Sequence, residues 1–211
     1  MKKKNIIKSV IAILIVIAII ILISKITGNK DANARRLAQL YNELNTNQTY
    51  LFEMEQSDDN KTIMAKKGDK TIIDQYSKDS HTTTIVKDNN TYLVLHDREE
   101  YYVYEQNNVE QSILTDGLRE IVDKEFITGE EKINGKKYSY EEYAGSTMFM
   151  ISSTLDVNEE DIKTRFYFDN DDNLVYIRTI KGAKQELLKI KIEKEVDDSI
   201  FEIPSNYAEN S

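Results

Sequence analysis

The chain of 211 residues has no cysteine, only two histidines and a single proline, Pro204. Without cysteine it can form no disulfide, no thiolate metal site and no nucleophilic thiol, and the cysteine-linked lipid anchor of bacterial lipoproteins is excluded. It also has no Gly/Ser-rich linker and no internal repeat. These absences predict one domain, at residues 31–211, after an N-terminal region of different composition.

Positive charge is scarce outside the N-terminal region. Residues 1–30 contain six lysines and no acidic residue. The whole chain has 28 basic and 37 acidic residues, so residues 31–211 carry a formal charge of −15. That excess repels phosphate backbones, and we predict no nucleic-acid partner.

Motifs for catalysis and for metal binding are missing as well. His81 and His96 belong to no H-x-x-x-H or H-E-x-x-H pattern, and the chain has no G-x-S-x-G elbow and no glycine-rich phosphate loop. Residues 169–173 resemble the start of a calcium loop, but Leu174 and Ile180 stand where that loop needs glycine and glutamate. The sequence therefore predicts no catalytic residue, no metal site, no cofactor and no enzymatic activity.

The longest apolar run occupies residues 10–23. With its flanks it covers residues 6–26, which as a helix would span roughly 30 Å, the thickness of a bilayer core. Lysines stand near both ends, at Lys8 and Lys25, where their stems can reach the headgroups. We predict that residues 1–30 form a single membrane anchor with a basic cytoplasmic start. Residues 31–211 would then be extracytoplasmic at the cell membrane.

A cleaved signal peptide is the alternative interpretation of this run. Its fourteen residues are at the upper limit for a signal peptide, and Ala32-Asn33-Ala34 offers a cleavage site after Ala34. That site lies eleven residues beyond the run, which is far for a peptidase at the membrane surface. We therefore favour the uncleaved anchor.

The rest of the chain predicts an α+β domain dominated by antiparallel strands. Apolar residues at helical spacing predict helices at 32–44 and 112–126. Short β-branched and aromatic runs between polar turns predict strands at 49–56, 61–66, 70–77, 82–87, 91–96, 101–104, 136–143, 162–168, 174–180 and 185–195. Residues 146–157 fit either a strand or a buried turn.

Several strands carry apolar residues on both faces, which predicts a sheet that is covered on both sides or has a hollow apolar side. In the second case, six aromatic residues are candidates to line a ligand cavity: Tyr50, Phe52, Tyr92, Tyr101, Phe166 and Phe168. The alternative is that the two helices cover the surplus apolar residues.

Two stretches carry a family resemblance. The hairpin at 164–177 and the tail at 196–207, with its pattern D-S-x-F-x-I-P-x-x-Y, resemble the outer-membrane lipoprotein carrier (LolA-like) superfamily, in the form of a Gram-positive, membrane-anchored relative. The resemblance implies a curved half-barrel of antiparallel strands with helices over its open side. It also implies a concave side that can hold acyl chains or a lipid.

Two functions follow as hypotheses. The first is a membrane-anchored protein that binds a lipid, a lipidated protein or another hydrophobic ligand in the half-barrel. The second is a non-catalytic structural or regulatory module at the cell surface that binds a protein partner. The first requires an apolar cavity, whereas the second requires a solid core and an exposed apolar patch.

Overall fold

The computed structural model describes residues 35–57, 59–105, 113–145 and 162–210, and those from residue 37 onward form one compact unit. The expected anchor at 1–30, the alternative cleavage after Ala34 and the open segment at 146–157 lie outside the described residues. Within the described part of the chain, no helix combines the length and the hydropathy needed to cross a bilayer. The membrane anchor and the cellular location stay predictions.

The first described helix is α2 (Arg36–Asn47). Its predicted apolar stripe is confirmed, because four residues join one core cluster: Leu37, Leu40, Tyr41 and Leu44. The helix ends three residues later than predicted. Gln48 then adopts a positive φ of 51°, and its N–H donates to the Leu44 carbonyl at 3.3 Å. Helices commonly end at a residue in the left-handed backbone conformation whose N–H donates to a carbonyl of the last turn.

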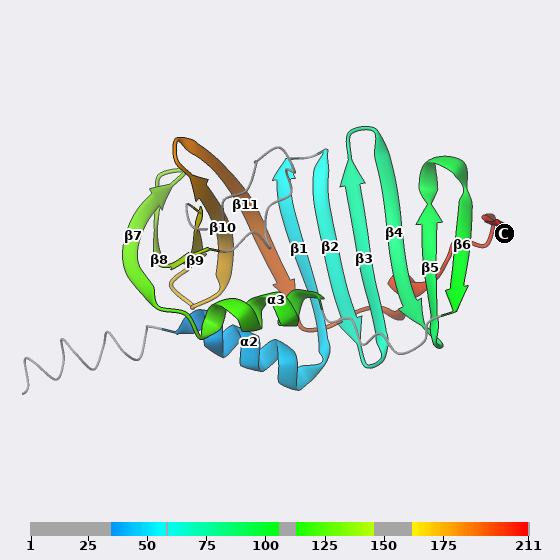
Figure 1. Cartoon of the computed structure of the whole chain (residues 1–211), viewed down its shortest axis with the longest axis horizontal. Coiled ribbons are helices and arrows are strands. Elements are labelled where there is room, and N and C mark those ends of the chain that lie inside the picture. Colours follow the sequence, from blue (N-terminus) through cyan, green and yellow to red (C-terminus); the bar gives the residue numbers. More distant parts are fainter. Residues whose placement is uncertain (1–34, 58, 106–112, 146–161, 211) are drawn as a thin grey trace, which may run out of the picture. The chain divides into compact units, whose positions relative to one another are not determined.

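The strands form a single twelve-stranded sheet in the order β12-β6-β5-β4-β3-β2-β1-β11-β10-β9-β8-β7 (Figure 1). Their bounds are β1 (Thr49–Ser57), β2 (Asn60–Lys67), β3 (Lys70–Ser77), β4 (Ser80–Lys87), β5 (Asn90–Leu95), β6 (Glu100–Glu105), β7 (Phe126–Ile133), β8 (Lys136–Ala144), β9 (Ile162–Phe168), β10 (Leu174–Lys181), β11 (Lys184–Glu193) and β12 (Ala208–Asn210). All neighbouring strands are antiparallel except β12, a short strand that the sequence did not predict and that runs parallel to β6.

The sheet is curved and open. Figure 1 shows β1 to β6 side by side, whereas β7 to β11 curl away from them. The strands at the two ends of the order, β12 and β7, pair only with β6 and β8 among the described strands. Together with the covering helices, this confirms the predicted α+β half-barrel in its coarse form.

The second described helix, α3 (Ile113–Val122), ends four residues earlier than predicted. The reason is that Phe126 begins β7, where it pairs with Tyr143 of β8, and the two ring centroids lie 5.2 Å apart. Tertiary pairing thus overrides the helical spacing of Phe126. The sequence did not predict the strand β7, because its residues after Phe126 are mainly charged or small and show no apolar alternation.

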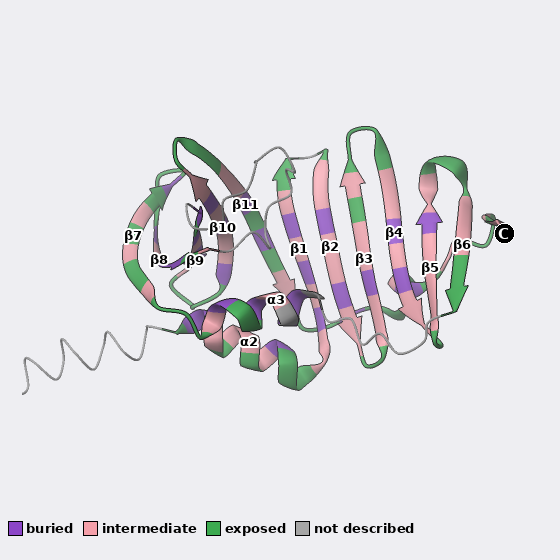
Figure 2. Cartoon of the chain, viewed as in Figure 1, coloured by how far each residue is buried: buried purple, intermediate pink, exposed green. Residues whose placement is uncertain are grey.

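One face of the sheet is covered by α2 and α3 and holds the larger core. Burial alternates along β1 (Figure 2). Its buried residues Tyr50, Phe52 and Met54 belong to the same core cluster as the apolar residues of α2 and α3. Strands β8 to β11 add seven buried residues to the same cluster: Tyr143, Phe166, Phe168, Leu174, Ile177, Leu188 and Ile190. We call this the helix-side cluster. Burial of each such side chain contributes about 1.5–3 kcal/mol.

One carboxylate lies within this core. Glu141 of β8 is fully buried and accepts hydrogen bonds from the Leu37 N–H at 3.3 Å and from the Tyr143 hydroxyl at 2.9 Å. The first N–H groups of a helix have no partner inside the helix. Glu141 therefore ties the start of α2 to the sheet.

The opposite face of β1 to β6 is covered by residues 196–207, which we call the strap. The strap includes the 3₁₀ helix η3 (Asp198–Phe201) and otherwise runs as irregular chain. Beneath it lie four buried residues of the sheet, Ala65, Ile72, Ile85 and Val94, which pack with Val196 and Phe201 of the strap and with partly buried residues that include Leu51, Tyr92 and Tyr101. This is the strap-side cluster. The surplus apolar residues of these strands are thus covered by the strap rather than by the helices alone.

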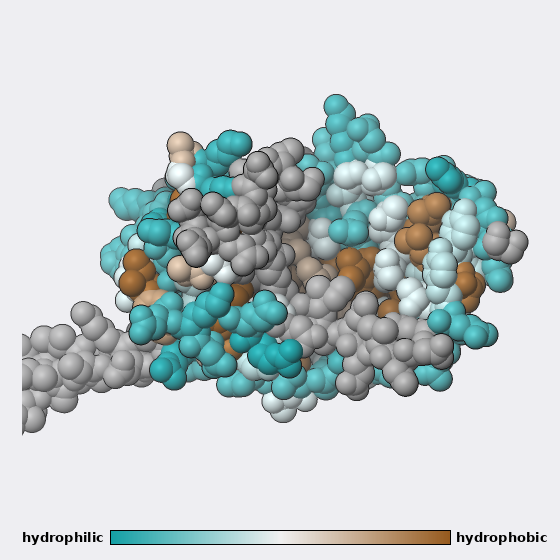
Figure 3. Space-filling view, in the orientation of Figure 1, coloured by the Kyte–Doolittle hydropathy of each residue, from teal (hydrophilic) through white to brown (hydrophobic). Residues whose placement is uncertain are grey.

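The helix-side face of β2 to β5 also carries partly buried apolar residues, of which Met64 packs against the helix-side cluster. Met64, Ile73 and Leu93 fall in one row of the strand register and are partly buried. Figure 3, which views this side, shows hydrophobic residues gathered over these strands. Apolar residues on both faces of the same strands are what the sequence predicts.

Candidate functional site

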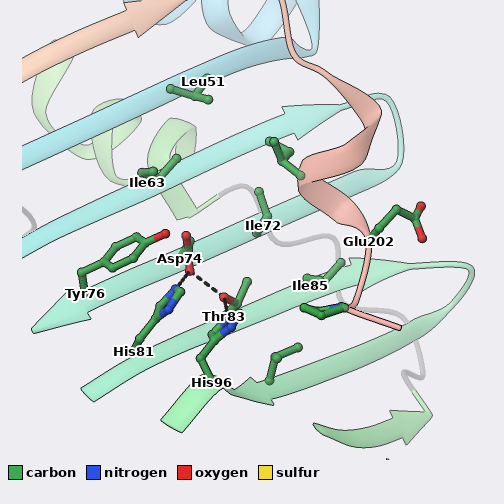
Figure 4. Close-up of a pocket in the computed structure, with 13 residues that line it drawn as sticks. Leu51, Ile63, Ile72, Asp74, Tyr76, His81, Thr83, Ile85, His96 and Glu202 are labelled. Carbon is green, nitrogen blue, oxygen red and sulfur yellow. Dashed lines mark hydrogen bonds and ion pairs between the residues drawn. The ribbon is translucent and has the colours of Figure 1, made fainter. Parts of the chain in front are cut away.

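A pocket of about 280 Å³ lies between the strap and strands β1 to β5 (Figure 4). Its apolar lining comes from Leu51, Ile63, Ile72, Ile85, Val94, Ile200 and Pro204. Its polar lining comes from Asp74, Tyr76, His81, Thr83, His96 and Glu202. Because residues at every second position of a strand share a face, the alternation of β3 and β4 carries Ile72 and Ile85 beside Asp74 and Thr83. The pocket is therefore amphipathic.

The polar end of the pocket is a connected group of side chains from neighbouring strands. Asp74 Oδ1 lies 2.8 Å from His81 Nε2 and 2.5 Å from the Thr83 hydroxyl. That hydroxyl lies 2.7 Å from His96 Nε2, and His96 Nδ1 lies 3.0 Å from the hydroxyl of Tyr207 in the strap. Asp74 and His81 have side-chain exposures of 14% and 27%, so the group is partly open to solvent.

The hydrogen bonds of this group have one consistent direction. The Asp74 carboxylate can only accept, so His81 Nε2–H and the Thr83 hydroxyl both donate to it. Since the one hydroxyl proton of Thr83 is used there, His96 Nε2–H must donate to the Thr83 oxygen. Tyr207 then donates to His96 Nδ1. The chain of donors runs from the strap to Asp74, and such chains strengthen one another.

Aromatic stacking holds the two imidazole rings in place. The rings of His81 and His96 lie 3.6 Å apart with planes only 6° from parallel, and Tyr76 stacks on the other side of His81 at 4.0 Å. Burial and the neighbouring His81 lower the pKa of His96, which favours its neutral form. Burial and a hydrogen bond with Asp74 raise the pKa of Tyr76 to about 12.

Ion pairs fasten the strap above the pocket. Asp198 lies 2.6 Å from Lys67 Nζ and 3.3 Å from Lys70 Nζ, and Glu202 lies 3.0 Å from Lys87 Nζ. The Asp197 carboxylate accepts from the Ser199 N–H at 2.8 Å and so caps η3. Beyond the strap, the backbone N–H of Ala208 donates to Glu99 O at 2.9 Å, where β12 begins.

The six predicted lining residues do not lie in one cluster. Tyr50, Phe52, Phe166 and Phe168 belong to the helix-side cluster, where each is at most 3% exposed. Tyr92 and Tyr101 belong to the strap-side cluster, with ring centroids 6.5 Å apart. The register of the strands explains the division. Phe52 and Leu93 lie in the same row of paired residues across β1 to β5 and so share a face of the sheet. Tyr92 precedes Leu93 and therefore lies on the opposite face. A role for any of these six residues in ligand binding stays a prediction.

The sequence did not predict that the two histidines form a pair, because no local motif brings them together. Thr82 and Leu95 form the outermost pair of the β4–β5 ladder. His81 and His96 are the next positions outward in the same register. Likewise, His81 lies opposite Tyr76, and Thr83 opposite Asp74, in the β3–β4 ladder. The polar turn after Lys87 fixes the register of the β4–β5 hairpin, and this register continued to the open end of the hairpin puts His81 opposite His96.

Two other polar groups fulfil structural roles. Asp169 Oδ1 accepts from the N–H groups of Asp171 and Asn173, both at 2.9 Å, so residues 169–173 form the turn between β9 and β10. On the outer face of the curled strands, Glu131 accepts from Tyr167 at 2.7 Å and from Arg165 at 2.9 Å, and it also pairs with Arg178. These contacts cross-link β7, β9 and β10.

The chain has distant neighbours among solved structures, including the two described below. No family model and no curated protein matches the chain in sequence. An uncharacterized conserved protein from Thermus thermophilus is 10% identical with a TM-score of 0.46, over 82% of this chain and 98% of the other. The lipoprotein LppX of Mycobacterium tuberculosis is 12% identical with a TM-score of 0.40, over 77% and 97% respectively. At this distance nothing about a ligand or partner follows from either.

Proposed function

We propose that this chain is a membrane-anchored, extracytoplasmic binding protein, not an enzyme, that holds a small amphiphilic molecule in the pocket beneath the strap. The observation that carries this proposal is the division of one pocket into an apolar end and a hydrogen-bonding end. Ligand pockets are typically lined by apolar side chains with a few placed polar groups that orient the ligand.

The size of the pocket narrows the class of ligand. At about 280 Å³ it lies just below the range of roughly 300–1,000 Å³ that is usual for drug-sized ligands. A small amphiphile, or a segment of one acyl chain, would fit. Of the lipid, lipidated protein and other hydrophobic ligands expected from the sequence, a single chain of a lipid agrees best with this volume.

The charge of the polar end favours a neutral or cationic head group. Asp74 is the acidic member of the hydrogen-bonded group at this end, whereas Glu202 lies apart from it on the strap (Figure 4) and pairs with Lys87, at the far end of β4 from His81, at 3.0 Å. The lowered pKa of His96, caused first by burial, keeps that ring uncharged near neutral pH. An anionic head group would therefore meet a carboxylate without gaining a cation.

The N-terminal run supports the location that we propose. Residues 10–23 would hold the domain beside the bilayer, where amphiphiles concentrate. We also propose that the chain is a Gram-positive relative of the LolA-like superfamily. The two resembling stretches support this because they are structural parts of the half-barrel: residues 164–177 form most of the β9–β10 hairpin, and residues 196–207 are the strap.

A protein-interaction module remains the competing function. It would need a contiguous exposed apolar patch. Among the described residues, the large exposed apolar side chains are Val103 and Tyr104 on β6 and Ile127 on β7. These strands stand near opposite ends of the sheet order, so the residues do not form one patch. The pocket therefore supports ligand binding better.

Native mass spectrometry of the full-length chain, extracted from membranes in mild detergent, tests the proposal. Ile63 lines the pocket, whereas its neighbour Met64 faces the helix side opposite Phe52. Ile63→Phe should fill the pocket and remove the extra mass of a bound amphiphile. Met64→Phe is the matched control and should retain it. Absence of any bound amphiphile from the wild type, or equal retention by both variants, would overturn the proposal.

A further inference from the structure

Three side chains with metal-ligating atoms converge at the polar end of the pocket. Asp74 of β3, His81 of β4 and His96, the first residue of η1 (His96–Arg98), each place one ligand atom within 4.8 Å of the others. Asp74 and His81 belong to the paired strands β3 and β4, and His96 directly follows β5, the next strand in the sheet, so strand pairing holds the three backbone positions close together. We propose that Asp74, His81 and His96 form a binding site for one divalent transition-metal ion of the zinc class.

The distances are close to those that such an ion requires. Zinc bonds of about 2.0–2.2 Å in a tetrahedral arrangement put neighbouring ligand atoms about 3.3 Å apart. His81 Nε2 and Asp74 Oδ1 are now 2.8 Å apart, and all three ligand atoms lie within 4.8 Å of one another. Side-chain rotation alone can cover these differences, so the strands need not move.

The ligand types select the class of ion. Two imidazole nitrogens and one carboxylate oxygen suit zinc and its first-row neighbours, whereas calcium and magnesium prefer sites made only of oxygen. Three protein ligands leave a fourth position open to water. That position faces the pocket, because all three residues line it (Figure 4).

The surrounding groups can support the loaded site. A histidine that binds a metal through Nε2 carries its proton on Nδ1, which usually donates to a second partner. Tyr207 lies 3.0 Å from His96 Nδ1, and its oxygen can accept that proton after the hydroxyl turns. The strap would thus fix the orientation of one metal ligand.

Loading requires one imidazole to leave the stack. The rings of His81 and His96 are within 6° of parallel, and two parallel rings cannot both point a lone pair at the same ion. Thr83 now bridges Asp74 and His96 through its hydroxyl. Metal binding would therefore replace these contacts rather than add to them. A purely hydrogen-bonded group is the competing interpretation, and it predicts no stoichiometric ion.

Calorimetric titration of Zn²⁺ into chelator-treated, full-length chain in mild detergent tests the site. We expect one Zn²⁺ per chain with a Kd of about 1 μM or lower. Asp74→Asn, His81→Phe and His96→Phe should each weaken binding by at least about tenfold. The phenylalanine variants keep an aromatic ring in the stack. Asp97→Asn is the matched control, because Asp97 accepts the His81 N–H at 3.2 Å but is no ligand, and it should leave binding unchanged.

Lack of stoichiometric Zn²⁺ binding by the wild type would overturn the proposal without any variant, and so would unchanged affinity in any of the three ligand variants. The metal site does not depend on the proposed amphiphile, although both use the same pocket. A chain with bound amphiphile but no zinc site would refute only the metal site. A chain with a zinc site but no amphiphile would refute only the proposed function.

Discussion

The two faces of the sheet are covered in different ways, and the coverings have different consequences. On the helix side, two helices bury aromatic and aliphatic residues almost completely, with Phe52 and Phe166 fully buried. On the strap side, residues 196–207 cover β1 to β5 only in part and leave a pocket of about 280 Å³. The helix side gains its stability from packing, whereas the strap is also fastened by ion pairs and a hydrogen bond to His96.

This difference places the tightly packed core on one face and the pocket that we propose for ligand binding on the other. A helix presents a broad apolar stripe that can fill the space above a sheet. A single extended segment is too narrow to do so, and the polar atoms near it find partners among side chains. Sites that bind ligands are expected where covering is incomplete, because a fully packed face has no room for one.

The largest expected effect separates the two faces at neighbouring positions of β1. Phe52→Ala should lower the free energy of unfolding by about 3–5 kcal/mol, since it leaves a cavity in a fully buried core. Leu51→Ala, on the strap side, should cost only about 1–2 kcal/mol because Leu51 is half-buried and already borders the pocket. Urea unfolding of both variants measures the difference. Equal losses would contradict the division between the faces.

A second test removes the carboxylate from the helix side. Glu141→Ala would remove the buried acceptor of the Leu37 N–H and of the Tyr143 hydroxyl, and the loss should cost about 1–3 kcal/mol. Tyr143→Phe removes only one donor and should cost less. Chemical denaturation followed by circular dichroism measures both. A loss for Glu141→Ala no larger than that for Tyr143→Phe would show that Glu141 does not hold α2.

A third test loosens the strap alone. Tyr207→Phe removes the hydroxyl that donates to His96 Nδ1 and should cost about 0.5–1.5 kcal/mol. Amide hydrogen exchange at Tyr207 and Ala208 should accelerate, since their N–H groups bond to Pro204 O and Glu99 O at the end of the strap. Exchange in α2 should stay unchanged. Uniform acceleration across the domain would mean that the strap does not open independently.

The smallest expected effect concerns Glu131, on the outer face of the curled strands, and depends on pH. Partial burial raises the pKa of Glu131, but hydrogen bonds from Tyr167, Arg178 and Arg165 outweigh it and lower the pKa below its ordinary value of 4.5. The stability from these bonds is therefore present above that value and is lost as the pH falls through the lowered pKa.

Glu131→Gln should consequently be less stable than the wild type at neutral pH, and the difference should shrink as the pH falls below 4.5 and through the lowered pKa of Glu131. Thermal unfolding across this range measures it. Glu130→Gln is the matched control, because Glu130 is exposed and pairs only at the surface with Lys137. A constant difference for Glu131→Gln at all pH values would show that its charge contributes nothing.

The sequence predicted the strands more closely than the site, for a physical reason. Strands β3 and β9 have the predicted bounds, because apolar alternation and turn residues are local signals. The strand β7 and the early end of α3 depend on Phe126 meeting Tyr143, a contact that local spacing cannot show. The pairing of His81 with His96 depends on hairpin register. The pocket depends on the strap returning across the sheet, which no local pattern encodes.

The short strand β12 also protects an edge. Its three residues pair with Glu100 to Tyr102 of β6 and so occupy part of a row of backbone donors and acceptors that would otherwise face solvent. Uncovered sheet edges recruit strands from other molecules. Deleting residues 208–211, or forcing them away with a bulky C-terminal fusion, should therefore promote intermolecular aggregation through β6, even though the hydrophobic interior is untouched.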